Sequence, residues 1–252
     1  MVELKEAAER LGVHYQTAYR WVRTGELRAH KIGTTYSVDE ADVVNFLEER
    51  NRPTAPPSKT QVRNWEHQQT RFSEFLLSGK EIEARAMVLR LFEGGVEVVD
   101  ICEYLFSPVL FQIGEFWAEG SLTIAEEHRA SAICERTLAA LMQNPRGRPR
   151  GVAVIGTPPG DEHSLPSAMA TAVLRSLRWQ VHHLGTQVPP KDFLKLVTDV
   201  GADLVVISVT HPSALPEGEV IEDLVSRAGI RVMMGGPGTP LRSLADIASR
   251  RV

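Results

Sequence analysis

Short apolar runs alternate with longer amphipathic segments along residues 152–252. The runs are VAVIGT, QVHHLG, LVVISVT and RVMMGG, and the segments that follow them are SLPSAMATAVLRSLRW, PKDFLKLVTDVG, EGEVIEDLVSRAG and PLRSLADIASRRV. Strand-length apolar runs separated by helical segments are typical of a parallel sheet, because parallel strands need long crossover connections. We therefore predict a doubly wound α/β domain of flavodoxin-like order. Its ligand crevice is expected beyond the carboxyl ends of the first and third strands.

Polar and small residues follow three of these predicted strands. They are Asp161 and His163 after the first strand, Ser208 and Thr210 at the end of the third, and Gly235, Gly236 and Gly238 after the fourth. A neutral imidazole in such a loop is a good metal ligand, and a nearby carboxylate can accept its other N–H and fix the tautomer. The sequence therefore predicts a ligand site at this edge, with His163 as an axial ligand. The structural alternative is a histidine that only caps the next helix.

Two segments rich in helix-ending residues divide the chain, PTAPPSK at 53–59 and NPRGRPRG at 144–151. They predict linkers between three domains, at 1–52, 60–143 and 152–252. The middle domain has a continuous helical pattern with breaks that define helices at about 60–77, 80–93, 96–117 and 123–143. Short connections between such helices favour an antiparallel four-helix bundle.

The first domain has the pattern of a winged helix-turn-helix. Apolar residues recur at helical spacing in two segments on either side of Gly12: Leu4, Ala7, Ala8 and Leu11 before it, and Ala18, Trp21 and Val22 after it. The segment AHKIGTTYSV then alternates around Gly33–Thr34, as the strands of a hairpin do. The residues expected to contact DNA are Tyr15, Gln16, Tyr19, Arg20 and Arg23 on the second helix and Lys31 in the wing. Residues 14–37 hold four basic residues and one acidic residue. A helical hairpin with a merely solvated charged face is the alternative. Because one such unit makes few contacts, operator binding implies a dimer or larger assembly.

One segment of the predicted bundle, GEFWAEGSLTIAEEHRA, combines a tryptophan at a helix end with polar residues on the next helix. The residues of interest are Trp117, Ile124, Glu127 and His128. Glu127 and His128 are adjacent, so their side chains should leave the helix about 100° apart and meet different partners. Taken singly, a tryptophan here is most often core, and a histidine most often lies in the interior or on the surface with its hydrogen bonds satisfied.

Composition excludes several classes of protein. No stretch approaches the roughly 18 consecutive apolar residues of a membrane span, and the N-terminus has no signal-peptide pattern, so we expect a cytoplasmic protein without membrane contact. Cys102 and Cys134 lie within helical apolar patterns and are expected as buried thiols. The net charge of −4 disfavours general electrostatic binding of nucleic acid but permits a local basic patch.

The spacing of these motifs resembles known families. The loop at Asp161 and His163 is similar to the D-x-H-x-x-G signature of cobalamin-binding domains, with Pro166 in place of the glycine; Ser208–Thr210 and GGPG are similar to the sites for the cofactor's tail. Trp117 with Glu127–His128 matches the W-x9-E-H motif of CarH-type B12-dependent photoreceptor regulators. The N-terminal domain resembles the excisionase-type winged helices related to the MerR group. The order of the three domains resembles the CarH type over the whole chain.

This resemblance implies an adenosylcobalamin-binding, light-responsive DNA-binding regulator rather than an enzyme. His163 would lie below cobalt, and Trp117, Ile124, Glu127 and His128 would surround the adenosyl group above it. The family's dark form is a tetramer on its operator that dissociates when light breaks the cobalt–carbon bond. Ala118 stands where photoreceptors of this type carry a second histidine that captures cobalt. The upper face should therefore stay open after illumination in this chain.

Three other classes share parts of these patterns. A corrinoid methyl carrier or enzyme component would have the same bundle and sheet, but it would have no function for the DNA-binding N-terminal domain. A transcriptional regulator that binds another ligand, such as haem, would have the DNA-binding domain but would not need the tryptophan motif. A structural α/β interaction module would need neither feature. Absorption spectra with adenosylcobalamin, before and after illumination, separate these classes.

Overall fold

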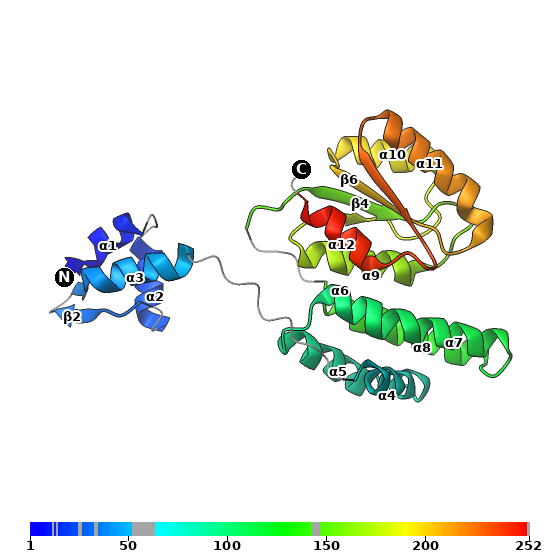
Figure 1. Ribbon diagram of the computed structural model, residues 1–252, viewed down its shortest axis with the longest axis horizontal. Coiled ribbons are helices and arrows are strands. Elements are labelled where there is room, and N and C mark those ends of the chain that lie inside the picture. Colours follow the sequence, from blue (N-terminus) through cyan, green and yellow to red (C-terminus); the bar gives the residue numbers. More distant parts are fainter. Residues whose placement is uncertain are drawn as a thin grey trace. The chain divides into compact units, whose positions relative to one another are not determined.

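A computed structural model describes residues 1–11, 13, 15–24, 27–32, 35–51, 64–142 and 147–250 (Figure 1). The chain forms two compact units, Met1–Ser58 and Lys59–Val252. The predicted linker at 53–59 lies outside the described residues, as do the turns at Gly12 and Gly33–Thr34 and residues 144–146 of the second linker. Since the bundle and the sheet belong to one unit, the predicted division between them stays a prediction.

The N-terminal unit contains the predicted pair of helices and the hairpin. Its elements are β1 (Val2–Glu3), α1 (Leu4–Arg10), α2 (Tyr15–Thr24), β2 (His30–Ile32), β3 (Thr35–Val38) and α3 (Glu40–Asn51). The strands form an antiparallel sheet of order β1-β3-β2, in which Lys31 pairs with Tyr36. Ala18 and Trp21 of α2 are buried, and the Trp21 ring packs against Phe46 of α3 at 5.1 Å between centroids. This core fixes which side of α2 faces outward.

Four helices of the second unit form the bundle, at the positions that the sequence predicts. They are α4 (Trp65–Leu77), α5 (Glu81–Glu93), a third helix made of α6 (Val98–Ile101), the π-helical η1 (Cys102–Phe106) and α7 (Ser107–Ala118), and α8 (Ile124–Ala139). Phe72 and Phe106 meet edge to face in the core, 5.1 Å apart.

The π-helical segment has a local cause. Pro108 lacks the N–H that would bond to the carbonyl of Tyr104 four residues earlier. The side-chain amide of Gln69 on α4 donates to that carbonyl instead, at 2.7 Å. A proline and a polar partner on the neighbouring helix thus account for the interruption in the third helix.

The remainder of this unit is the predicted α/β fold. Its elements are β4 (Val152–Gly156), α9 (Ser164–Ser176), β5 (Gln180–His183), α10 (Pro190–Asp199), β6 (Leu204–Ser208), the short 3-10 turn η2 (Pro212–Ala214), α11 (Leu215–Arg227), β7 (Arg231–Gly235) and α12 (Leu241–Ser249). All strand pairs are parallel, in the order β5-β4-β6-β7. The first and third strands are therefore neighbours, as expected for a flavodoxin-like switch point. Among the described residues, this parallel sheet has no fifth strand, and every residue of its edge strand β7 is only half-buried.

Alternate residues of the strands enter two different cores. Ala153 and Ile155 of β4 pack on the side of α9 and α12, whereas Val154 packs on the side of α10 and α11. Figure 1 shows α9 and α12 on the face of the sheet that is turned to the bundle. Because alternate side chains of a strand point to opposite faces, a parallel sheet buried on both faces needs apolar residues at successive positions.

Helix α9 is buried on two sides. Ala170 and Leu174 belong to the core beneath the sheet, whereas Leu165 and Met169 belong to the core of the bundle. Pro166 occupies the first turn of α9, where a proline is tolerated because the N–H of that position has no helical partner. The start of α9, and with it the loop that ends at His163, is held by packing from both layers.

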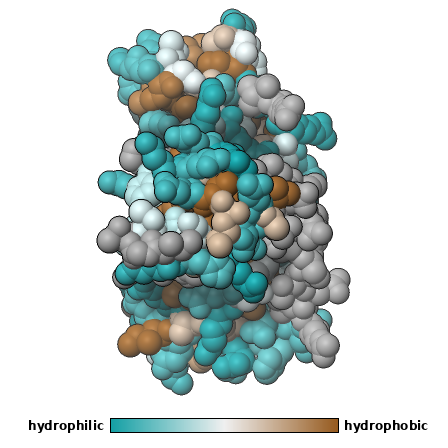
Figure 2. Space-filling view, turned by 90° about the vertical axis from the view of Figure 1, so that its left-hand side faces the viewer, coloured by the Kyte–Doolittle hydropathy of each residue, from teal (hydrophilic) through white to brown (hydrophobic). Residues whose placement is uncertain are grey.

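The molecule's surface and its cysteines are those of an ordinary globular protein. Figure 2 shows mainly hydrophilic residues on one side, with apolar residues in small separate patches. Among the described residues, no helix has both the length and the apolar character that crossing a bilayer requires. Cys102 and Cys134 are buried free thiols, as predicted, and burial raises the pKa of each above its ordinary value.

Candidate functional site

A buried carboxylate holds the candidate axial histidine. Asp161 is fully buried, and its Oδ1 accepts hydrogen bonds from Nδ1 of His163 at 2.8 Å and from the His163 backbone N–H at 3.0 Å. With Nδ1–H as the donor, the lone pair of Nε2 remains available to a metal. The His163 side chain is 54% exposed, so its ring reaches the surface while its base is anchored.

The other oxygen of Asp161 connects two strand ends. Oδ2 accepts from the backbone N–H groups of Thr210 and of His211, the latter at 3.1 Å, just beyond the end of β6. Burial by itself raises the pKa of Asp161, but the hydrogen bonds from Thr210, His163 and His211 outweigh it and lower the pKa below its ordinary value. Asp161 is therefore an anion at neutral pH, and it joins the β4 loop to the β6 loop.

The backbone of the β4 loop is also fixed. Thr157 is buried, and its hydroxyl donates to the carbonyl of Asp161 at 2.7 Å while it accepts from the N–H of Gln187 at 2.9 Å. Gly160 has a φ of +86°, a value that favours glycine, at the turn before Asp161. These contacts hold Asp161 and His163 in place without a ligand.

The strand ends beside this loop supply a hydroxyl and an open backbone. Ser208 is buried and pairs in register with Gly235 of β7. The hydroxyl oxygen of Thr210 is buried and has no hydrogen-bond partner among the described residues. A Cβ at Gly236 would lie 2.1 Å from the carbonyl oxygen of Val209, so this position excludes any side chain. Gly236 therefore lets the end of β7 pack closely against the backbone of Val209, and the unpartnered hydroxyl of Thr210 is a polar group that a ligand could satisfy.

Helix α8 carries a row of polar side chains toward the histidine loop. The Ser131 hydroxyl donates to Glu127 Oε1 at 2.6 Å, and one turn further Glu135 accepts from the hydroxyl of Ser164, next to His163, at 2.6 Å. Eight residues separate Glu127 from Glu135, which places Glu127 about 12 Å along the helix from the loop contact. Glu127 therefore lies about two turns of α8 away from the contact with the histidine loop.

The four predicted residues of the bundle surround this end of α8. Trp117 is 50% exposed and Ile124 is 61% exposed, so neither is a core residue. Nδ1 of His128 lies 2.8 Å from Oε2 of Glu127. Glu127 and His128 therefore contact each other, because rotation about their side-chain bonds offsets the roughly 100° between their Cα–Cβ directions. Glu127 alone also bonds to Ser131, and the expectation that the two residues meet different partners stays a prediction.

Several residues of this site were absent from the prediction. The five residues are Thr157, His211 and Ser131, which bond directly to predicted residues, and Gln187 and Glu135, which bond to Thr157 and to Ser164 beside them. Only Ser131 and Glu135 had a local signal, since they continue the Glu127 row at intervals of four residues. The others come from segments that are distant in sequence.

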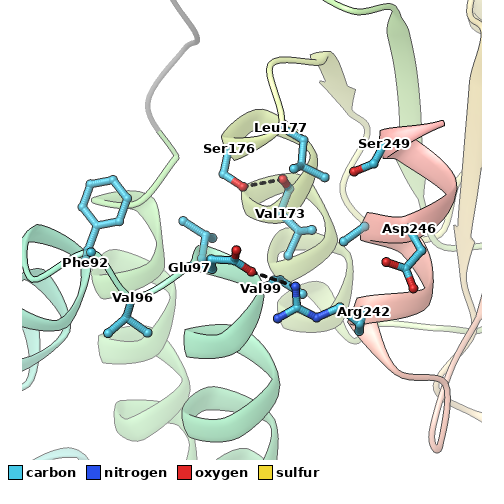
Figure 3. Close-up of a pocket in the computed structure, with 13 residues that line it drawn as sticks. Phe92, Val96, Glu97, Val99, Val173, Ser176, Leu177, Arg242, Asp246 and Ser249 are labelled. Atoms are coloured by element: carbon cyan, nitrogen blue, oxygen red, sulfur yellow. Dashed lines mark hydrogen bonds and ion pairs between the residues drawn. The ribbon is translucent and has the colours of Figure 1, made fainter. Parts of the chain in front are cut away.

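The bundle and the sheet meet again at a cavity of about 440 Å³ between the α5–α6 connection, α9 and α12 (Figure 3). At its wall, the guanidinium of Arg242 bonds to Glu97 at 2.7 Å and to Asp100, and the Arg242 backbone N–H bonds to Glu103 at 2.7 Å. None of the predicted site residues lines this cavity. The Arg242 contacts tie α12 to the beginning of the third bundle helix.

The N-terminal unit presents an aromatic row on its candidate DNA face. Tyr15 and Tyr19 are exposed and stack at 6.2 Å between centroids, and Tyr36 of the wing meets Tyr19 edge to face at 5.8 Å. Gln16 and Lys31 are also exposed. Arg20 and Arg23 belong to α2, but their side chains lie outside the described residues. The helix and the wing thus form one continuous surface.

Comparison with protein families accounts for all three parts of the chain. Residues 1–51 match a helix-turn-helix domain, residues 151–247 match a B12 binding domain, and residues 68–142 match a second B12 binding domain. The chain therefore combines a DNA-binding module with cobalamin-binding domains, which is the composition of a cobalamin-binding regulator.

Individual relatives include both corrinoid proteins and a transcriptional repressor. The dimethylamine corrinoid protein of Methanosarcina barkeri is 27% identical over 65% of this chain and 80% of its own length. The HTH-type transcriptional repressor CarH of Myxococcus xanthus is 32% identical over 52% of this chain and 45% of its own length. The solved monomethylamine corrinoid protein of Methanosarcina barkeri shares the fold of this chain, with a TM-score of 0.59 and 15% identity over 73% of this chain and 98% of that one.

Proposed function

We propose that this protein is a light-responsive transcriptional repressor that binds adenosylcobalamin between its bundle and its sheet. The observation that carries the proposal is the Asp161 network, which leaves Nε2 of His163 free and ready to ligate a metal. When bound, adenosylcobalamin supplies a cobalt–carbon bond that light can break.

Each group around this site has a part in the proposal. His163 would hold cobalt through Nε2, and Asp161 would retain the Nδ1 proton. Ser208, Thr210, Gly235 and Gly236 line the path of the cofactor's tail, where the unpartnered hydroxyl of Thr210 supplies a hydrogen bond. Trp117, Ile124, Glu127 and His128 cover the adenosyl group, which gives the exposed indole and isoleucine side chains an apolar partner.

The N-terminal unit supplies DNA binding. Tyr15, Gln16, Tyr19, Arg20 and Arg23 enter the major groove with α2, and Lys31 contacts the backbone from the wing. The cofactor-bound form assembles as a tetramer that pairs these units on the operator. Loss of the adenosyl contacts at Trp117 and His128 favours a smaller species, because a ligand that contacts only one state stabilises that state.

Spectra and DNA binding together test the proposal. The protein mixed with adenosylcobalamin should show a spectrum with a protein nitrogen below cobalt, change on illumination, and then release duplex DNA. His163→Ala should bind cobalamin more weakly and lose the nitrogen-ligated spectrum, whereas the control His182→Ala on β5 should retain both. An unchanged spectrum and affinity in His163→Ala would remove that residue from the cofactor.

A corrinoid methyl carrier is the second candidate. It is favoured by the coverage of the dimethylamine corrinoid protein, 80% of whose length matches this chain. A carrier would exchange a methyl group with a partner methyltransferase and would bind DNA equally in light and darkness. The illumination experiment therefore separates the two functions.

A further inference from the structure

Four arginines from three segments of the chain meet at the edge of the sheet opposite the His163 loop. The N–H of Arg150 donates to the carbonyl of Arg178 at 2.9 Å, and the guanidinium of Arg178 donates to the carbonyl of Arg148 at 2.9 Å. The guanidinium of Arg150 donates to the carbonyl of Ser249 at 3.2 Å, next to Arg250. We call Arg148, Arg150, Arg178 and Arg250 the arginine edge. Figure 1 shows its elements together, with the end of α12 beside the segment that leads into β4.

These charges are not neutralised by ion pairs. All four residues are exposed, and no ion pair in the described part of the chain includes any of them. The side-chain hydrogen bonds of Arg150 and Arg178 go to backbone carbonyls, which carry no net charge. Two carboxylates are near: Asp203 accepts from the N–H of Val152 at 2.8 Å, and Asp246 precedes Arg250 by one turn. The arginine edge therefore keeps a positive balance in a chain whose net charge is −4.

These contacts also hold the guanidinium groups of Arg150 and Arg178 in position. Arg178 has a φ of +69°, an uncommon value for a residue with a side chain, and the buried Trp179 beside it donates its indole N–H to Ala248 at 3.1 Å. Exposed cations held close together suit a polyanion, since less side-chain entropy remains to be lost on binding. Arginine binds phosphate oxygens particularly well because of its planar set of donors.

We propose that the arginine edge binds the phosphate backbone of duplex DNA and thereby assists the helix-turn-helix unit. The helix-turn-helix unit belongs to the same chain, so its binding raises the local concentration of DNA around this edge, and a weak electrostatic contact becomes effective. The contact reads no sequence, because it involves phosphates alone. It lies at the amino ends of β4 and β5, so it does not compete with the cofactor loop at their carboxyl ends. This inference rests on the DNA-binding part of the proposed function and not on the cofactor.

The salt dependence of binding tests this inference. Anisotropy of a labelled duplex of arbitrary sequence should be measured with the full chain over a series of KCl concentrations. Each phosphate contact contributes about 0.9 to the slope of log K against log salt. Arg148→Gln/Arg150→Gln/Arg178→Gln should therefore lower the slope by roughly 2 to 3 and weaken binding by roughly tenfold or more at low salt.

A matched control removes the same charge elsewhere. Lys191→Gln/Lys195→Gln/Arg227→Gln alters exposed cations on α10 and α11, two of which are paired with Asp199 and Asp223. It should keep the wild-type slope. The three edge arginines changed to lysine should also retain most of it, since an ammonium still neutralises a phosphate. Far-UV circular dichroism identifies any variant that has lost its fold, and Arg148→Gln, which removes no side-chain hydrogen bond found among the described residues, then provides the test with a slope lower by about 0.9.

The outcomes distinguish this inference from the proposed function. Repeating the edge substitutions in an Arg20→Ala background shows whether the edge acts when the helix-turn-helix is weakened. An unchanged slope in the edge variant would overturn the inference even if Arg20→Ala abolishes specific binding. An equal loss in the control variant would also overturn it, because net charge would then be the cause. If the glutamine variant of the arginine edge kept its DNA affinity but lost binding to an acidic protein, the edge would serve a different partner and the inference would be refuted.

Discussion

Asp161 should contribute more to this protein than any other single polar side chain at the site. Its carboxylate accepts from three backbone N–H groups, those of His163, Thr210 and His211, and from the imidazole of His163. Asp161→Ala leaves those three backbone donors without an acceptor. Each unsatisfied buried donor costs about 1–3 kcal/mol, and partial access of water to the exposed His163 and His211 favours the lower part of that range. We expect a loss of about 3–5 kcal/mol in the free energy of unfolding.

Asp161→Asn separates stability from ligation. The amide oxygen of the new asparagine should take the place of Oδ2 and accept from the backbone N–H groups of Thr210 and His211. The NH2 group of the amide then faces His163. His163 must then accept at Nδ1 and carry its proton on Nε2, where it blocks a metal. Cobalamin affinity should fall by about 10- to 100-fold, the usual effect of losing such a supporting carboxylate. The fold should be less affected than in Asp161→Ala.

The pH dependence of stability has a definite sign here. Because the folded-state pKa of Asp161 lies below its unfolded value, its contribution is complete above the unfolded pKa of about 3.9 and is lost as the pH falls through the folded pKa. Urea unfolding of the apoprotein at neutral and at acidic pH measures this loss of stability. Visible absorption spectra of the protein mixed with cobalamin measure the change in ligation. A cost below about 1 kcal/mol in Asp161→Ala would show that water satisfies these donors and that the reasoning fails.

Three further predictions concern other parts of the molecule. Arg242→Met should destabilise the second unit by about 1–3 kcal/mol in urea unfolding, because Glu97 and Asp100 lose their partly buried partner; equal stability of variant and wild type would contradict this. Arg20→Ala should weaken operator binding by about 1–3 kcal/mol if it reads a base, or lower the salt slope for all sequences if it contacts phosphate, and fully retained binding would exclude it. After illumination the wild-type spectrum should respond to added imidazole or cyanide, whereas Ala118→His should show two histidine nitrogens on cobalt; two nitrogens in the wild type would refute this.

Local periodicity was enough to predict most of the elements and their order, although β1 and α3 were not predicted. The strands of the α/β region, the four bundle helices and the winged helix-turn-helix all follow from apolar spacing, because the 2.0- and 3.6-residue periods are properties of neighbouring residues. The parallel order followed from the helical crossovers. The pairing of Asp161 with His163 was also predictable, since a single residue separates them and the loop brings them together. Pro108 is a local cause of the π-helical segment and can be read from the sequence. The hydrogen bond from Gln69 to the carbonyl of Tyr104 comes from another helix and could not be predicted from local sequence.

Tertiary structure alone decided which distant groups complete each site. The N–H groups that hold Asp161 lie 49 and 50 residues away, and Ser164 meets Glu135 across 29 residues. The arginine edge joins three segments that no spacing rule connects, and the Arg242 contacts cross about 140 residues of chain. Such contacts depend on how layers pack and on which rotamer each side chain adopts there. A one-dimensional pattern records the residue types that can form them but not the distances at which they meet.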